Sequence, residues 1–419
     1  MPNVVIGRDM KDIEKFGEKG TIMIGKHIVG TGEDAHLTSP ILVDVLRPHS
    51  MIICGKRGGG KSYTLGVFVE EMKKIQKDIR KNLCSLMIDT QGIFWTMKYP
   101  NDDAKSLLSK WGLKPTGIDV NVYVPYGQKE LFENAGVNFD GTFSIDPAEL
   151  YPDDWLYVFN LDINDSLGIL LERVITKMKK NYKSSYRIDD IIINIKKEEG
   201  FEKEKLALEN RFLAAKMWGI FGENAMPKIL EPEKITILDV SMTPASVRTL
   251  LVSIVLKKIL EKRIKARRLE ELAKVENEEI KRVPLCWVFI DEAHNFVPNV
   301  GKVASSDILL RIIKEGRQPG VSTVFATQRP NKLHPDVIAQ SDLIISHRLT
   351  SKADIESLKA IMQTYMLFDI GKYLNDLPRM KGAALIMDDN SERIYKVQVR
   401  PRQSWHAGSS PLAIDEKFM

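Results

Sequence analysis

Cysteine and long apolar runs are both scarce in this chain of 419 residues. Its three cysteines, Cys54, Cys84 and Cys286, each lie in a short apolar run. An odd number of cysteines in such runs predicts three buried thiols, which excludes a disulfide framework and a zinc site. No apolar run reaches the roughly 20 residues that a membrane-spanning helix needs, and the first residues do not resemble a signal peptide. We therefore expect a cytoplasmic protein without a membrane partner.

Charge of one sign is also limited, because 61 Lys and Arg residues against 56 Asp and Glu residues leave a net charge of +5. This balance permits a nucleic-acid partner through a local basic surface but does not require one. The seven histidines show no metal-ligand spacing. With a hydrophobic content of 43%, the length predicts one large α/β domain with insertions, or two to three domains.

The most informative feature that is present is the glycine-rich segment 55–62, which reads GKRGGGKS. It fits the pattern G-x-x-x-x-G-K-[ST] of a phosphate-binding loop (P-loop), and it lies between a strand-like run and a helix-like run, as that motif requires. Glycine lets backbone N–H groups close around phosphate oxygens. A chance glycine-rich turn is the alternative, and the flanking context disfavours it. The residues expected to bind ATP are Gly55, Lys56, Arg57, Gly58, Gly59, Gly60, Lys61, Ser62 and Tyr63.

Short apolar runs alternate with helix-like segments along the chain. The central runs are too uniformly apolar for half-exposed strands and are typical of buried parallel strands. Helical periodicity is clear over 250–274 and 307–315. This alternation predicts an α/β fold with a doubly wound, mostly parallel sheet. The predicted strands are 50–54, 84–89, 119–124, 235–240, 285–290, 321–327, 343–347, 383–387 and 395–399.

Two regions interrupt the alternation. Residues 1–49 carry glycines among short strand-like pieces, so we expect a short β-rich amino-terminal region. The stretch from about 128 to 230 has few strand signals and a clear helical pattern over 166–180, so we expect a helical insertion. The ATPase core is then predicted to span 50–402, and residues 403–419 to form a tail.

A second set of residues completes the predicted site. The apolar run 285–290 ends in two acids, and side chains at a strand end point in opposite directions. We expect Asp291 to hold Mg²⁺ together with the Ser62 hydroxyl, while Lys61 reaches the β- and γ-phosphates. Glu292 is expected to polarise the attacking water. Gln328, after the next strand, is interpreted either as a sensor of the γ-phosphate or as a surface residue.

Taken together, these segments resemble the HerA/FtsK superfamily of P-loop ATPases, and most of all its archaeal HerA-like branch. The resemblance extends over most of the chain, and the tetrapeptide Thr327-Gln328-Arg329-Pro330 downstream of Asp291-Glu292-Ala293-His294 is quite specific. Further matches are Met87-Ile88-Asp89, Val122-Tyr123-Val124-Pro125-Tyr126-Gly127, Gly316-Arg317, Arg348-Leu349-Thr350-Ser351-Lys352 and Val399-Arg400-Pro401-Arg402.

The resemblance implies a RecA-like core that assembles as a homohexameric ring and translocates on double-stranded DNA at the expense of ATP. It also implies that an arginine at the position of Arg317 acts in trans on the neighbouring subunit's nucleotide, with Arg348 as a second candidate. From its own position at a helix end, Arg317 is equally well interpreted as neutralising that helix end.

The chain departs from the family pattern in two places. Family members carry a full β-barrel before the P-loop, which helps to dock a partner nuclease, whereas about 50 residues precede Gly55 here. The family's Asp-Pro-His-Gly-Glu-Tyr motif reads Asp89-Thr90-Gln91-Gly92-Ile93-Phe94, so no carboxylate follows the glycine. The first departure favours an alternative function, an ATPase that regulates a partner nuclease or defence effector without processive translocation.

Basic residues interleaved with tyrosines are candidates for contact with the DNA backbone, which would not read sequence. The alternative interpretation is an exposed helix end. A motor for genome packaging or conjugative transfer is a third possibility that the sequence does not separate from the first. The DNA-binding candidates are Lys177, Lys179, Lys180, Lys183 and Arg187, together with Lys302 in the loop after Glu292.

Overall fold

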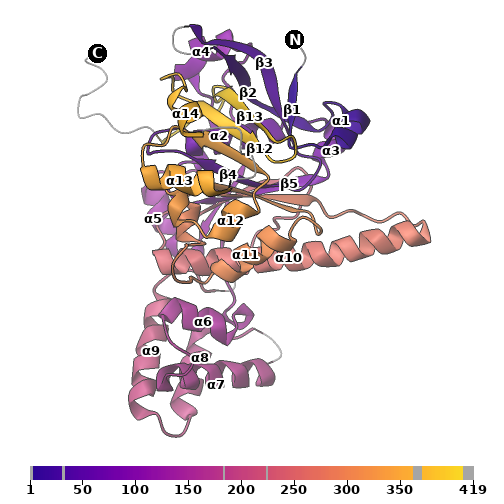
Figure 1. The fold of residues 1–419 in the computed structure, drawn as a ribbon. Coiled ribbons are helices and arrows are strands. Elements are labelled where there is room, and N and C mark those ends of the chain that lie inside the picture. The colour runs from indigo at the N-terminus through magenta and orange to yellow at the C-terminus, as the bar shows by residue number, and fades with distance from the viewer. Residues whose placement is uncertain (1–2, 31–33, 183–184, 223–224, 362–369, 409–419) are drawn as a thin grey trace.

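One mixed sheet organises the computed structural model, which describes residues 3–30, 34–182, 185–222, 225–361 and 370–408. Within these residues the sheet has thirteen strands in the order β1-β3-β2-β13-β12-β11-β4-β10-β9-β5-β8-β6-β7 (Figure 1). The strands are β1 (Val4–Ile6), β2 (Thr21–Val29), β3 (His36–Asp44), β4 (Ser50–Cys54), β5 (Leu83–Asp89), β6 (Asn121–Pro125), β7 (Gly141–Phe143), β8 (Ile235–Asp239), β9 (Leu285–Ile290), β10 (Val321–Thr327), β11 (Leu343–His347), β12 (Ala383–Asp388) and β13 (Arg393–Val399).

The half of the sheet from β11 to β7 is parallel throughout. Every residue of β5 and β10 is buried, as the uniformly apolar runs predicted. Each predicted strand is present, whereas β7 has only three residues, too few to give a pattern in the sequence. Because the strands run in one direction, their carboxyl ends form one edge of the sheet, where ligands of such folds bind.

Helices cover both faces of the parallel half. In β4, Met51 and Ile53 pack on the side of α2, and Ile52 and Cys54 pack on the side of α10 and α11. The helices are α1 (Met10–Phe16), α2 (Lys61–Met72), α3 (Lys77–Arg80), α4 (Lys105–Lys110), α5 (Lys129–Asn134), α6 (Pro152–Phe159), α7 (Ser166–Asn181), α8 (Ile188–Lys197), α9 (Glu202–Lys216), α10 (Ala245–Glu276), α11 (Ser306–Glu315), α12 (Pro335–Ala339), α13 (Lys352–Ile361) and α14 (Ile370–Asn375).

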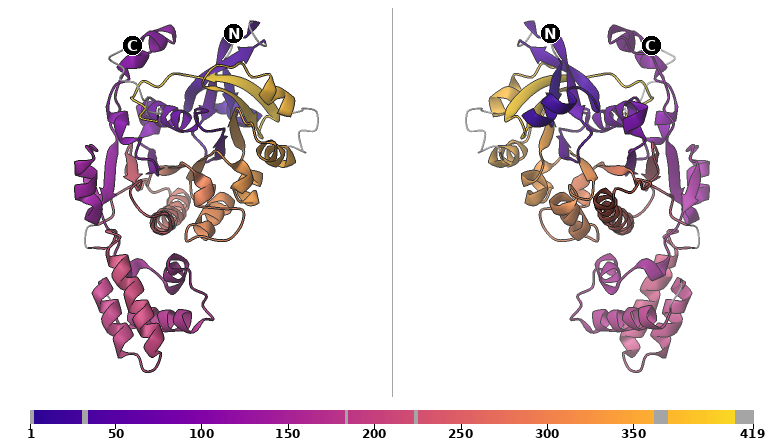
Figure 2. Two further views of the ribbon diagram at one scale, coloured as in Figure 1. Left: turned by 90° about the vertical axis from the view of Figure 1, so that its left-hand side faces the viewer. Right: turned by 90° about the vertical axis from the view of Figure 1, so that its right-hand side faces the viewer.

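The first three strands extend the same sheet. β2 pairs with β3 and with β13, both antiparallel, and β13 joins the core through β12. The amino-terminal strands and the last two strands of the chain therefore lie side by side, as Figure 2 shows. Residues on both sides of the P-loop in sequence thus build one β-rich region above the parallel half.

Four helices, α6 to α9, lie between β7 and β8 in sequence and hang below the sheet (Figure 2). They pack around Trp155, whose ring centroid lies 4.8 Å from that of Phe212. These helices occupy the segment that was expected to be a helical insertion. The mixed α/β fold with a large, mostly parallel sheet is confirmed.

The long helix α10 has 32 residues and projects beyond the sheet (Figure 1). The projecting half of α10 is rich in charged residues. Among the described residues, no helix is both long enough and apolar enough to cross a bilayer. The three cysteines are free and buried, as expected from their apolar surroundings.

Candidate nucleotide-binding site

The P-loop leaves β4 and enters α2 at the carboxyl edge of the sheet. Gly58 and Gly60 have φ angles of 71° and 110°, in the left-handed region that favours glycine. The loop is fastened to the end of β11, because the N–H of Lys56 donates to the carbonyl of Arg348 at 3.1 Å. Lys61 opens α2 and is buried, with its Nζ 3.3 Å from the carbonyl of Lys56.

His347, the last residue of β11, packs against the P-loop and the first turn of α2. Its Nε2 lies 2.9 Å from the Thr64 hydroxyl, and its Nδ1 lies 3.2 Å from the carbonyl of Ala383. Burial lowers the pKa of His347 to about 4, so the ring is neutral. A side chain at Gly60 would bring its Cβ within 3.3 Å of this ring. This contact was not predictable from local sequence, because it depends on the pairing of β4 with β11.

The metal side of the site consists of Ser62 and Asp291. The Ser62 hydroxyl donates to Oδ2 of Asp291 at 2.7 Å. Burial and the neighbouring Glu292 raise the pKa of Asp291, while the Ser62 hydroxyl and the Lys61 ammonium lower it. A hydroxyl and a buried carboxylate oxygen are ligands that Mg²⁺ prefers beside nucleotide phosphates. These two residues therefore fit a magnesium ion.

Glu292 has one occupied and one open carboxylate oxygen. Its Oε1 lies 3.3 Å from Nε2 of Gln328 and 3.5 Å from Nε2 of Gln91. Its Oε2 is buried and makes no hydrogen bond among the described residues, and Nδ1 of His294 lies 3.5 Å from it. Burial raises the pKa of Glu292. The open oxygen is the one that can accept a proton from a water molecule.

The strand order explains why Gln328 reaches Glu292. β10 lies between β4 and β9, so its carboxyl end separates the P-loop from the two acids. Gln328 follows β10 directly and therefore lies at the strand end between those of β4 and β9. This position is the one that a γ-phosphate sensor needs, and the sensing role itself stays a prediction.

Gln91 is a site residue that the sequence reasoning did not select. It follows β5, and its N–H donates to Oδ1 of Asp89 at 3.0 Å. Gly92 and Phe94 donate to the same carboxylate, so Asp89 holds the turn that carries Gln91. Burial and the adjacent Asp239 raise the pKa of Asp89 to about 7. The departure of residues 89–94 from the family motif was the sequence feature that could have pointed to Gln91.

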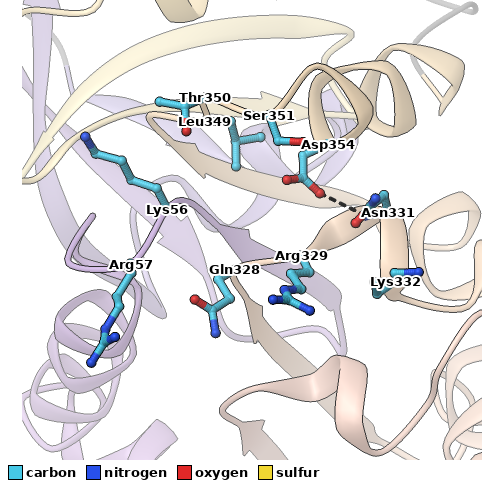
Figure 3. A pocket seen from close by; sticks show the side chains of 10 residues that line it. All are labelled: Lys56, Arg57, Gln328, Arg329, Asn331, Lys332, Leu349, Thr350, Ser351 and Asp354. Carbon is cyan, nitrogen blue, oxygen red and sulfur yellow. Dashed lines mark hydrogen bonds between the residues drawn. The ribbon is translucent and has the colours of Figure 1, made fainter.

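A basic cavity of about 380 Å³ opens beside the P-loop (Figure 3). Lys56 and Arg57 line it from the loop, and Gln328, Arg329 and Lys332 line it from the segment after β10. This concentration of positive charge suits a polyanion such as a nucleoside triphosphate. The remaining lining residues are Asn331, Leu349, Thr350, Ser351 and Asp354.

The segment after β13 holds the P-loop helix in place. Glu70 of α2 is fully buried and accepts from Arg400 Nη2 at 2.8 Å. The Arg402 guanidinium packs so closely on α2 that a Cβ at Gly66 would lie 2.6 Å from its Cζ. The backbone N–H of Arg402 also donates to the Tyr63 hydroxyl at 2.5 Å. The Arg-Pro-Arg motif therefore positions the helix that carries Lys61 and Ser62.

The two candidate trans arginines lie at opposite edges of the sheet. Arg348 follows β11 and lies beside the P-loop of its own chain. Arg317 precedes β10, and its Nη2 lies 3.0 Å from Oδ2 of Asp342. Because a strand rises about 3.3 Å per residue, the seven residues of β10 place Arg317 far from Gln328. Arg317 therefore does not reach the nucleotide site of its own chain.

Several DNA-binding candidates already have partners within the chain. Lys177 pairs with Glu198 at 2.7 Å, and Lys302 pairs with Asp307 at 3.0 Å. Lys179 is half-buried, with its Nζ over the Tyr151 ring. Lys180 is exposed at the end of α7, Arg187 precedes α8, and Lys183 lies outside the described residues.

Comparison with known proteins places this geometry in a family. The family described as "Helicase HerA, central domain" matches residues 22–259, more than half of the chain. A probable helicase of Methanocaldococcus jannaschii is 29% identical over 198 residues, which cover 46% of this chain and 36% of that protein. A probable DNA double-strand break repair helicase HerA of the same organism is 24% identical over 336 residues, 71% of this chain and 61% of that protein. The chain thus spans less than two thirds of either relative.

Solved structures share the fold at low sequence identity. VirB4 of Thermoanaerobacter pseudethanolicus aligns with a TM-score of 0.58 at 13% identity, covering 92% of this chain and 97% of that one. The bacterial conjugative coupling protein TrwB aligns with a TM-score of 0.52 at 14% identity, covering 92% and 96%. The family match and these folds agree with the motifs at the carboxyl edge of the sheet. The chain belongs to the HerA helicase central-domain family, within the HerA/FtsK superfamily of P-loop ATPases.

Proposed function

We propose that this chain hydrolyses ATP as a subunit of a homohexameric ring that moves on double-stranded DNA. The observation that carries the proposal is the convergence of three groups at one edge of the sheet. They are the P-loop, the Ser62–Asp291 pair at 2.7 Å, and Glu292 with one open oxygen. The P-loop and the two acids are far apart along the chain, and the strands that precede them, β4 and β9, are separated by β10 in the sheet. Their convergence therefore does not follow from local sequence and supports a common site.

Each residue then has a defined task. The backbone N–H groups of the P-loop and the Lys61 ammonium bind the phosphates of ATP. Ser62 and Asp291 hold Mg²⁺, which neutralises phosphate charge when it is bound. Glu292 accepts a proton from the attacking water through Oε2, while Gln328 and Gln91 hold Oε1.

The placement of Arg317 supports a ring. Its guanidinium is on the amino edge of the sheet and its side chain is 66% exposed. If the amino edge of one subunit faces the carboxyl edge of the next, Arg317 meets a neighbour's γ-phosphate and stabilises the charge of the transition state. Arg348 acts within its own subunit in this arrangement.

Double-stranded DNA as the substrate rests on the named relatives, two of which are described as helicases. Lys177 and Lys302 each form an ion pair with an acid of the same chain, so the proposal does not depend on these two residues for contact with DNA. Binding through phosphates is expected to be independent of sequence and weakened by salt.

The test is ATP hydrolysis by the purified chain with and without long linear duplex DNA, together with the particle mass. The proposal predicts hydrolysis that duplex DNA stimulates and a mass of six subunits. Absence of hydrolysis contradicts it. Hydrolysis that DNA leaves unchanged favours the alternative of an ATPase that regulates a partner nuclease or defence effector.

A further inference from the structure

A row of alternating charges runs through the amino edge of the sheet and ends at Arg317. Arg8 Nε donates to Oδ1 of Asp44 at 2.7 Å, and Oδ2 of Asp44 lies 3.2 Å from Nε2 of His49. His49 Nδ1 lies 2.6 Å from Oδ2 of Asp342, and the same oxygen accepts from Arg317 Nη2 at 3.0 Å. The row connects the amino-terminal strands to the candidate trans arginine.

His49 occupies the centre of this row and bridges its two acids. Both ring nitrogens face carboxylates, so both must carry protons for the two contacts to be hydrogen bonds. Although burial alone would lower it, the hydrogen bonds to Asp342 and Asp44 raise the pKa of His49 to about 9. A cationic ring between two buried carboxylates keeps both of them charged.

The backbone around His49 fixes the ring in place. Its N–H donates to the Ser322 hydroxyl at 3.2 Å, and its carbonyl accepts from the N–H of Thr323 at 2.9 Å. Gly7 has a φ of +80°, and a Cβ there would lie 3.1 Å from His49 Cε1. The amino-terminal segment therefore closes directly over the imidazole, and glycine is required for it to do so.

The Arg317 side chain has one partner among the described residues. Its guanidinium donates a single hydrogen bond there, from Nη2 to Asp342. Asp342 is 5% exposed, whereas the Arg317 side chain is 66% exposed. The remaining N–H groups of the guanidinium are therefore free to donate outward, toward an adjacent subunit.

We propose that His49 is a positioning residue that orients Arg317, through Asp342, toward the nucleotide of the neighbouring subunit. The amino-terminal strands then contribute to catalysis in the next subunit of the ring, although they lie far from the P-loop of their own. This inference rests on the proposed function, because it assumes that Arg317 acts in trans.

Mixed assemblies test the inference, because each subunit gives an arginine to one site and a glutamate to another. Subunits with Glu292→Gln retain Arg317 and act as donors, and subunits with Arg317→Ala retain Glu292 and act as acceptors. Mixing the two is expected to restore ATP hydrolysis. His49→Gln is then added either to the donor or to the acceptor subunits.

We expect His49→Gln in the donors to lower the restored rate at least about tenfold, since small misplacements of a catalytic group cost up to about a hundredfold. The same change in the acceptors should leave the restored rate unaltered. A lower restored rate in both placements means that His49→Gln causes a general folding defect. An unchanged rate in both placements means that Arg317 does not need His49 for its orientation. Both of these outcomes overturn the inference.

Two further variants keep the test decisive. If His49→Gln does not fold, Asp342→Asn removes one charge at nearly constant shape, and the same asymmetry between donor and acceptor is expected. Arg311→Ala is the matched control, because Arg311 is an exposed arginine on α11 paired with Glu315 at 2.9 Å. It should leave the restored rate unchanged in either placement. If the parent mixture restores nothing, the trans role of Arg317 fails, which is a failure of the proposed function itself.

Discussion

The Ser62 hydroxyl donates a 2.7 Å hydrogen bond to Oδ2 of Asp291, although the strands that precede the two residues, β4 and β9, are not neighbours in the sheet. The strand between them, β10, ends at Thr327, so that Gln328 lies beside Glu292, with its Nε2 3.3 Å from Oε1. The P-loop, Gln328 and the Asp291–Glu292 pair thus follow three consecutive strands of the sheet, β4, β10 and β9.

Replacement of Glu292 by glutamine should separate nucleotide binding from hydrolysis. The amide keeps the shape of the side chain but does not accept the proton of the attacking water, so turnover should fall about a hundredfold or more. Binding of ATP with Mg²⁺ should persist, and an equilibrium binding assay beside a phosphate-release assay measures both. Glu315→Gln on the exposed end of α11 is the control. A normal rate in Glu292→Gln refutes the role of Glu292.

Asp291→Asn should raise the Mg²⁺ concentration needed for half-maximal hydrolysis. The change removes a buried negative charge that faces Ser62, and loss of groups around a metal commonly costs about 10–100-fold in affinity. A Mg²⁺ titration of the hydrolysis rate measures this shift. Asp307→Asn, at an exposed acid paired with Lys302, should leave the titration unchanged. An unshifted titration in Asp291→Asn excludes Asp291 as a metal ligand.

Gln91→Ala should lower kcat with little effect on KM. Its amide lies 3.5 Å from Oε1 of Glu292, so we expect Gln91 to orient the base and not to bind ATP. We expect a fall of about tenfold, near the low end for proton-transfer catalysis. Steady-state kinetics measure the two constants. A rise in KM at constant kcat shows instead that Gln91 contacts the nucleotide.

Glu70→Gln should destabilise the fold strongly. Although burial alone would raise it, Arg400 and Arg402 lower the pKa of Glu70. Glu71 still reaches Arg400 at 2.8 Å, so Arg402 loses its carboxylate while it stays buried. Breaking such a buried pair costs about 3–5 kcal/mol, which urea denaturation at pH 7 measures.

The same pair sets a pH dependence and a control. Since the pKa of Glu70 is lowered on folding, its stabilisation is present above the ordinary carboxyl range and is lost as pH falls through that range. The difference in unfolding free energy between the native chain and Glu70→Gln should therefore shrink toward acid pH. Glu233→Gln, which breaks a partly exposed pair with Arg80, should cost about 1 kcal/mol or less. Equal effects of the two changes contradict the buried-clamp interpretation.

The strands and the motif residues were predictable because their signals are local. The run at 285–290 is apolar throughout, since β9 is covered on both faces, and Asp291 and Glu292 follow it directly. Gln91, His347 and Asp342 were not predictable. Their roles depend on which strands become neighbours, and strand order is set by packing across the whole sheet. The antiparallel pairing of β12 and β13 with β2 is likewise a property of the tertiary fold.

Arg317 marks the limit of local inference most clearly. As a residue at a helix end, it was compatible with neutralising that end or with acting in trans. Its place on the amino edge, with the nucleotide site on the carboxyl edge, excludes action on its own nucleotide. In the proposed ring, a neighbouring subunit brings the γ-phosphate to it.

The most direct test of the whole account is ATP hydrolysis in mixtures of Arg317→Ala and Glu292→Gln subunits at varied ratios. Each variant alone should be nearly inactive, because every site lacks either its arginine or its base. In mixed rings, an Arg317→Ala subunit with intact Glu292 receives Arg317 from a Glu292→Gln neighbour, so activity should rise to a maximum at intermediate ratios. Activity that never exceeds that of the separate variants at any ratio would contradict the account.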